Sequence, residues 1–254
     1  MDDYIEFIVR GRGSDIWSDL SKPMLIPEDL YVARLGLKNF STYNNIPNVE
    51  VNVNNKLKIK VPDHEYKLFS LETGAYELKM IAKQIHNWIG VKHPNLKDVE
   101  ENFQLVGNEA TSKAEFIFKD GYGVDFNVPA SMHKILGFAK NKKIEGLGRY
   151  PAKEIINIVT VTQIVFNCSV TTSNYINGKE SPFLYNCGID VPVGYRLSRE
   201  LTDISYKKLT TTQLSRIRVW VVDQNGAPVN LRDDELTVTL SLQLKPHAAK
   251  VSIV

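Results

Sequence analysis

The sequence predicts an all-β fold, an antiparallel sandwich or barrel, from three observations. Short segments in which apolar and polar residues alternate recur along the chain, separated by clusters of Gly, Pro, Asn and Asp. Only two segments have helical spacing, and they do not alternate regularly with the strands, which argues against a parallel α/β sheet. No segment is repeated. We therefore expect eight to ten short strands, with two short helices in the connections.

The clearest strands lie near residues 216–221 and 236–244. In the first, Ile, Val and Val alternate with Arg, Arg and Trp; in the second, Leu and Val alternate with Thr, Ser and Gln. Asn225-Gly226 favours a tight turn between them. We expect a hairpin whose apolar face, including Leu240, lies in the core.

Two helices and one long strand are expected in the middle of the chain. Apolar residues from Tyr76 to Ile89 recur at helical spacing, and Gly90 is expected to end that helix. Ser131 is a candidate N-cap for a short helix over SMHKILGF. The stretch INIVTVTQIVFNCSV, residues 156–170, is apolar on both faces and predicts a strand covered on both sides.

The expected domain layout is an extended arm followed by one domain. Residues 1–28 combine a short apolar run, the glycine-rich RGRGSD and two prolines, which favours an extended arm over a packed element. From residue 29 to residue 254 the β pattern continues without a change in composition. We expect these residues to form a single domain, which a chain of this length can fold around one core.

Composition and charge exclude several classes of protein. The 254 residues carry a formal net charge of +2, too balanced to indicate a nucleic-acid-binding surface. The N-terminal stretch has no apolar segment typical of a signal peptide, and no apolar run is long enough to span a membrane. The two cysteines, Cys168 and Cys187, are expected to be free thiols in a reducing compartment.

The sequence favours no motif for catalysis, cofactor binding or metal binding. The five histidines form neither an HxxxH pair nor an HExxH site, and the cysteines lack CxxC spacing. The acidic clusters at residues 100–101 and 233–235 lie in polar turns, where solvated carboxylates are the simplest interpretation. We therefore expect no catalytic residue, no cofactor and no metal, and the protein is not expected to be an enzyme.

Several stretches, in order, resemble a known family. They are LKNFSTYNNIPNV, NNKL, TGAYEL, VDFNVPASMHKILGF, INIVTVTQIVFNCSV, SNYINGKESPFLYN, VPVGYRL and VVDQNGAPVNLRDDELTVTLSLQLK. The set covers about residues 30–245. It resembles the penton-like minor capsid proteins of Polinton (Maverick) elements and adintoviruses.

The resemblance implies a single jelly roll and a role in assembly. It implies a homo-pentamer at the five-fold vertices of an icosahedral shell, surrounded by a double-jelly-roll major capsid protein. The location is then the virion, after synthesis in the host cytoplasm and with assembly there or in the nucleus. A vertex fibre and the packaged genome are further candidate partners.

The arm is the candidate contact segment under this interpretation, because it is too apolar for a solvated tail. Its apolar residues and arginines are expected to dock beside neighbouring capsomers: Ile5, Phe7, Ile8, Arg10, Arg12 and Trp17.

Three alternatives remain open from the residues. The first is a jelly-roll binding module, lectin-like or cytokine-like, and the second is a capsid-derived protein reused by a host. The third is a cupin-like enzyme, which the histidine spacing disfavours.

Overall fold

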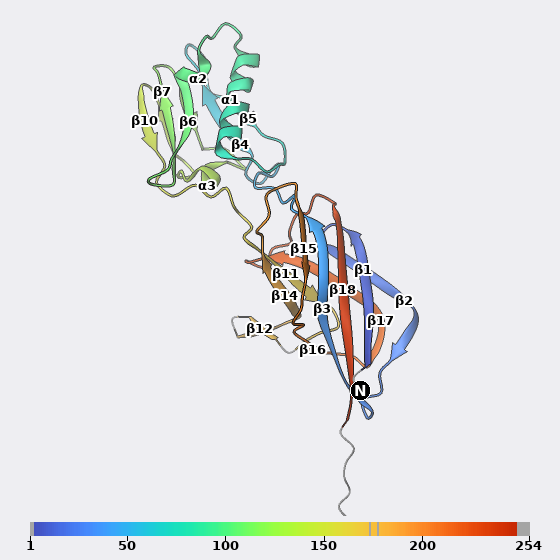
Figure 1. Ribbon diagram of the computed structural model, residues 1–254. Coiled ribbons are helices and arrows are strands. Elements are labelled where there is room, and N and C mark those ends of the chain that lie inside the picture. Colours follow the sequence, from blue (N-terminus) through green and yellow to red (C-terminus); the bar gives the residue numbers. More distant parts are fainter. Residues whose placement is uncertain (1–2, 173, 177, 248–254) are drawn as a thin grey trace, which may run out of the picture. The chain divides into compact units, whose positions relative to one another are not determined.

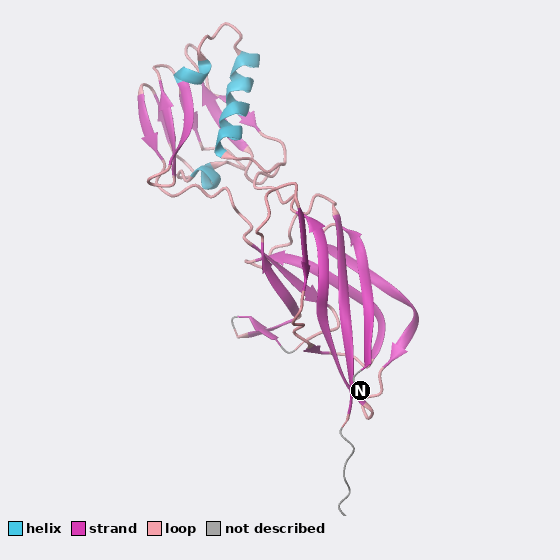
Figure 2. Ribbon diagram, in the orientation of Figure 1, coloured by secondary structure: helices cyan, strands magenta, loops and turns pink. Residues whose placement is uncertain are grey.

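The computed structural model describes residues 3–172, 174–176 and 178–247, and it divides into two compact units (Figures 1 and 2). One unit consists of residues 1–46 and 161–254, and the other of residues 47–160. Each unit has its own cluster of buried apolar side chains. The second unit is thus inserted into the chain of the first, and the expected single domain over residues 29–254 is wrong.

The first unit is an antiparallel jelly-roll β-sandwich with eight main strands. In chain order they are β1 (Asp3–Arg12), β2 (Asp15–Leu25), β3 (Tyr31–Tyr43), β11 (Gln163–Cys168), β14 (Phe183–Gly188), β15 (Arg196–Glu200), β17 (Gln213–Asp223) and β18 (Glu235–Pro246). One sheet has the order β1-β18-β3-β15 and the other β14-β11-β17-β2 (Figure 1). The predicted all-β sandwich is confirmed.

Three short strands accompany the jelly roll. The two-residue strand β16 (Lys207–Lys208) pairs with β3. A small hairpin of β12 (Asn174–Ile176) and β13 (Lys179–Ser181) lies between β11 and β14 in the chain. This hairpin forms a sheet of its own.

Residues 3–25 belong to the sandwich, so the expected extended arm is wrong. Strand β1 pairs with β18 over its whole length, from Asp3 opposite Leu244 to Arg12 opposite Glu235. Strand β2 pairs with β17. The glycine-rich RGRGSD is not part of an extended arm: it supplies the tight connection between the two strands, where Gly13 adopts a φ of +80° that favours glycine.

The two closing strands are present, but they do not form a hairpin. β17 lies in one sheet and β18 in the other. The turn at Asn225-Gly226 returns a short segment onto the end of β17, where Asp223 N–H donates to the Ala227 carbonyl at 2.8 Å. The chain then crosses to the opposite sheet. Residues 230–234 span this crossing, and Leu231 among them is buried in the core, an arrangement that the turn signal alone could not indicate.

The jelly-roll core lies between the facing sides of the two sheets. Alternate residues of β18 are fully buried, namely Leu236, Val238, Leu240 and Leu242, and β17 buries Ile217, Val219 and Val221 against the same cluster. The alternation that predicted each strand therefore also predicted its buried face. Both cysteines are free and buried in this unit.

The inserted unit contains two small sheets and the three helices found among the described residues. Its elements are β4 (Lys56–Lys60), β5 (Lys67–Ser70), α1 (Leu78–Lys92), α2 (Val99–Asn102), β6 (Phe103–Asn108), β7 (Lys113–Phe118), β8 (Gly123–Asp125), α3 (His133–Leu136), β9 (Lys143–Glu145) and β10 (Gly148–Pro151). The sheet orders are β5-β4-β8-β9 and β10-β7-β6. Helix α1 packs against β6, and phenylalanines fill much of the core.

Several sequence expectations fall in or beside this unit. Helix α1 buries Ile81, Ile85 and Ile89 as the spacing predicts, but it continues past Gly90 to Lys92. At α3 the N-cap is Met132, one residue after Ser131. The long strand expected over residues 156–170 is limited to β11. Val159 is 68% exposed, because the residues before β11 connect the two units.

Among the described residues, no helix has the length and hydrophobicity that a bilayer crossing requires.

Replacing Leu240 with Ala is expected to destabilise the jelly roll by about 2–5 kcal/mol, because a fully buried side chain leaves a cavity. Ile8→Ala is the matched control, since Ile8 lies on the neighbouring strand and is 61% exposed. Its effect is expected to stay within about 0.5 kcal/mol. Urea unfolding measures both changes, and equal losses for the two variants would contradict the assigned faces.

A fragment of residues 47–160 is expected to fold alone, because its core is built from its own residues. The expected result is a cooperative thermal transition by circular dichroism. Phe116→Ala, which removes a fully buried ring, should lower the midpoint of that transition. A fragment without any cooperative transition would show that this core depends on the jelly roll.

Candidate assembly surface

The candidate surface is the flank of the jelly roll where β1 and β2 form the outer edges of the two sheets. Among the described strands, β1 pairs only with β18 and β2 only with β17. Each of these edges therefore leaves one side of its backbone without a strand partner. Unpaired edges of this kind can accept a further strand from another chain.

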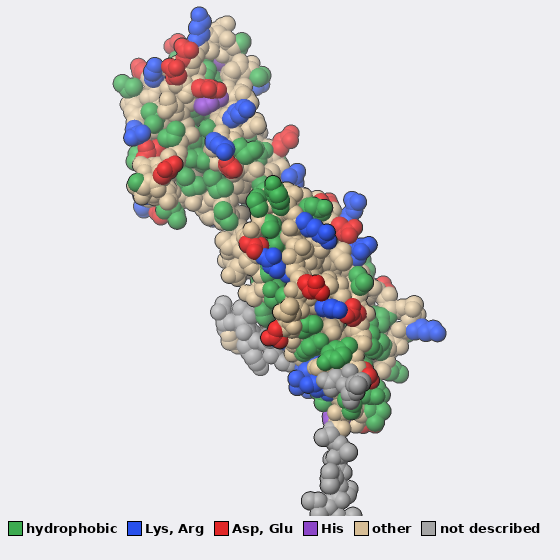
Figure 3. Space-filling view, in the orientation of Figure 1, with side chains coloured by type: hydrophobic (Ala, Val, Ile, Leu, Met, Phe, Trp, Pro, Cys, Tyr) green, Lys and Arg blue, Asp and Glu red, His purple; other side chains and the backbone are tan. Residues whose placement is uncertain are grey.

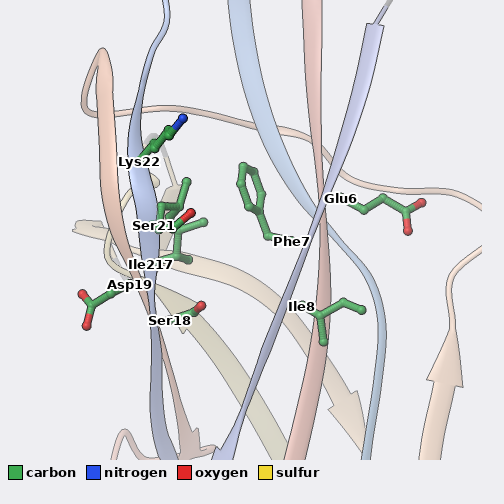
Figure 4. Close-up of a pocket in the computed structure, with 9 residues that line it drawn as sticks. Glu6, Phe7, Ile8, Ser18, Asp19, Ser21, Lys22 and Ile217 are labelled. Carbon is green, nitrogen blue, oxygen red and sulfur yellow. The ribbon is translucent and has the colours of Figure 1, made fainter.

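The two edge strands touch at one end and diverge toward the other. A Cβ atom at Gly11 would lie 2.6 Å from Cγ2 of Ile16, so only glycine allows β2 to cross so close to β1. Beyond this point the strands separate and leave a groove of about 270 Å³ (Figure 4). Its lining consists of Glu6, Phe7, Ile8, Ser18, Asp19, Leu20, Ser21, Lys22 and Ile217.

The groove leaves apolar core side chains only partly covered. Figure 4 shows Phe7 pointing from β1 toward β2, whereas Glu6 and Ile8 point the other way. The side chains of Ile5, Phe7, Leu20 and Met24 pack against the core cluster but are not fully buried. This flank therefore has apolar surface that a docking partner would remove from water.

Two ion pairs join β2 to β17 on the outer face of their sheet, beside the groove. Arg216 donates Nε to Oδ1 of Asp19 at 2.6 Å, and Arg218 donates Nη2 to Oδ2 of Asp15 at 2.6 Å. Hydrogen bonds from these guanidinium groups lower the pKa values of both carboxyl groups. Arg218 also lies over the ring of Trp220, at 5.2 Å from its centroid. Both ion pairs are exposed, so each is expected to add little stability.

The structure divides the six predicted contact residues between inward and outward faces. Ile5 and Phe7 face the core, whereas Ile8 and Trp17 are 61% and 57% exposed. Arg12 is exposed. Arg10 pairs with Glu235 at 3.5 Å and donates to Thr237. All six belong to β1 and β2, so the flank gathers them, although as strands and not as an arm.

Sequence reasoning missed the ion pairs and the groove. The spacing of Asp15 with Asp19, and of Arg216 with Arg218, already places each pair on one face of a strand. What the sequence does not show is that β2 pairs with β17, about 200 residues later. The groove follows from that pairing together with the glycine at position 11.

Charges on the visible face of the molecule are mixed. In the space-filling view, basic and acidic side chains alternate with hydrophobic ones over the jelly roll, and no single-sign face forms there (Figure 3). Where the structure describes the chain, no group of three or more His, Cys, Asp or Glu residues is placed to hold a metal.

One histidine pair forms in the inserted unit. The rings of His64 and His93 lie 4.4 Å apart, and burial lowers the pKa of His93, with a smaller contribution from His64. These two side chains are too few for a structural metal site.

Comparison with known proteins identifies no family. No protein-family model and no curated protein matches the sequence. Among solved structures, the chain is similar to the selenomethionine-labelled mavirus penton protein, with a TM-score of 0.49 and 11% sequence identity. The alignment covers 97% of this chain and 100% of that one. A likeness at this level carries no argument about function. The function is therefore inferred from the chain's own residues.

Both cysteine thiols are expected to be unreactive in the folded protein. Burial raises the pKa of Cys168 to about 11 and also raises that of Cys187, so neither forms much thiolate near neutral pH. A colorimetric thiol reagent at pH 8 should detect almost no thiol in the native protein and two per chain after denaturation. Fast reaction of either cysteine in the native protein would show that it is accessible.

Proposed function

We propose that this chain is a structural capsid protein, a penton-like subunit that forms pentamers at the five-fold vertices of an icosahedral shell. The observation that carries the proposal is a single jelly roll whose β1–β2 flank leaves core side chains partly uncovered. The ordered stretches that resemble penton-like proteins of Polinton elements and adintoviruses point to the same role. The activity would be assembly and not catalysis.

A jelly roll is suited to this role for a physical reason. Most of its strands pair internally, so the subunit is stable before it assembles. Its two flanks differ: one consists of β1 and β2 and the other of β14 and β15. Contacts between unlike flanks are heterologous, and they generate a closed ring when the rotation between copies closes. Five copies would complete the ring at a vertex.

The partners and location follow from this proposal. The pentamer would contact a double-jelly-roll major capsid protein around each vertex, with a vertex fibre or the packaged genome as further partners. The chain would be located in the virion, after synthesis in the host cytoplasm and with assembly there or in the nucleus. The mixed charge on the visible face is consistent with protein partners for that surface (Figure 3).

Native mass spectrometry of the purified chain tests the proposal. Five copies of a 28.8 kDa chain give an expected mass of about 144 kDa, with five-fold rings in negative-stain images. Dilution should release monomers without unfolding them, because each subunit has its own core. A chain that stays monomeric at every concentration, or that forms a symmetric dimer, would contradict the proposal.

A further inference from the structure

We propose that the outer face of β2 and β17 is a binding site for a neutral oligosaccharide chain. This face, called here the β2–β17 platform, consists of Asp15, Trp17, Asp19, Arg216, Arg218 and Trp220. The inference goes beyond the proposed capsid role, because it assigns a ligand to the folded subunit and not a contact between subunits. It is based on strand register, on the exposure of one indole ring and on the pairing of the charges.

Strand register brings the six side chains of the platform together on one face. They form three rows across the two strands, with the opposite pairs Asp15–Trp220, Trp17–Arg218 and Asp19–Arg216. Residues two apart on a strand point to the same side of a sheet, so the rows share the face opposite the core. Four steps of about 3.3 Å separate the first row from the third, which makes the platform about 13 Å long.

The platform faces away from the groove between β1 and β2. Figure 4 shows the Asp19 side chain pointing away from Phe7, which lines the groove from the β1 side. The core side of β17 is formed instead by Ile217 and Val219, which are fully buried. A ligand on the platform would therefore lie on the outer surface of the sheet.

Trp17 supplies an exposed aromatic surface in the middle row of the platform. It is 57% exposed, whereas Trp220 is partly buried and has the Arg218 guanidinium over its ring at 5.2 Å from the centroid. A sugar ring has faces of C–H groups, which pack on the flat side of an indole, and hydroxyl groups around its rim. An exposed indole with polar groups on both sides along the strand matches both kinds of surface.

The polar groups beside Trp17 are held in fixed positions. Arg218 donates Nε and Nη2 to the two carboxylate oxygens of Asp15 at 2.7 and 2.6 Å. Arg216 donates the same two groups to Asp19 at 2.6 and 3.2 Å. The four side chains are 46–62% exposed, and each keeps donors or lone pairs beyond those used in the pairs. Hydroxyl groups of a bound sugar can therefore hydrogen-bond to them.

The pairing of the charges favours a neutral ligand over a charged one. Two arginines and two aspartates cancel within the platform, so it offers no net attraction to the phosphates of a nucleic acid or to an acidic peptide. Hydrogen bonds from the arginines lower the pKa values of Asp15 and Asp19, so both pairs stay ionised below neutral pH as well.

The same four charges disfavour a protein partner on this face. The centres of protein–protein interfaces are depleted in charged residues, and burying an ion pair has a desolvation cost. A protein docked on Trp17 would cover both ion pairs at once. A sugar chain leaves these groups hydrogen-bonded, because its hydroxyls both donate and accept.

Binding of soluble oligosaccharides to the purified chain tests the platform. The probes are cellohexaose and chitohexaose, which are neutral, and a heparin hexasaccharide as the charged comparison. Isothermal titration calorimetry should show binding of at least one neutral probe. The tryptophan emission should shift to shorter wavelength as the sugar displaces water from Trp17. The heparin probe should bind no more tightly than that neutral probe.

Single variants show whether the bound sugar lies on the platform. Trp17→Ala should weaken binding by about tenfold, because it removes the stacking surface. Arg218→Lys keeps the charge but loses the planar fork, and it should weaken binding by about threefold. Tyr195→Ala is the matched control, since Tyr195 is an aromatic residue outside the platform that is 65% exposed, and it should leave the affinity unchanged. Equal urea midpoints would show that the variants are folded.

The outcomes separate this inference from the proposed function. A neutral probe whose affinity falls with Trp17→Ala and Arg218→Lys, but not with Tyr195→Ala, supports the platform. Absence of binding by both neutral probes at millimolar concentration overturns it, and so does tighter binding of heparin or an equal loss in the two aromatic variants. Ring formation is measured separately by native mass spectrometry, so either inference can fail while the other stands.

Discussion

The structure depends on the pairing of β18 between β1 and β3. This places residues 235–246 at the centre of one sheet, with residues 3–12 on one side and residues 31–43 on the other. The inward face of β18 is fully buried, and it meets the inward face of β17 across the core. Most of the other features follow from this arrangement, because it makes β1 an edge strand and fixes where the groove can open.

The inserted unit does not alter this arrangement. It enters after Ile46 and leaves at Thr160, between the third and fourth strands of the jelly roll, and it has a phenylalanine-rich core of its own. An insertion at a loop between strands costs the host fold little. The jelly roll can therefore supply the assembly contacts independently of what the inserted unit does.

The sequence predicted local structure well where one physical rule decides it. Alternation from Leu236 to Leu244 predicted a strand and its buried face, and the spacing of Ile81, Ile85 and Ile89 predicted a helix and its buried face. Sequence-based prediction failed where one residue type, such as glycine, can serve two different structural roles. Gly11 and Gly13 contributed to the prediction of an extended arm, whereas one permits a close strand crossing and the other a tight turn. Both units are β-rich, so composition does not change at residues 46–47, and the boundary was missed.

The candidate surface could be predicted only in part from the sequence. Residues such as Phe7 and Trp17 indicated that the N-terminal stretch has apolar contacts to make, but not that Phe7 faces the core and Trp17 faces solvent. The groove depends on strand pairings that join residues about 200 positions apart, and no local pattern encodes them.

Hydrogen–deuterium exchange on dilute and assembled protein is the most direct measurement of whether the β1–β2 flank is the assembly surface. The account predicts that amides in residues 4–8 and 18–22 become protected on assembly, while the buried centre of β18 is unchanged. Protection confined to other parts of the jelly roll, with the β1 and β2 amides exchanging equally in both states, would contradict it.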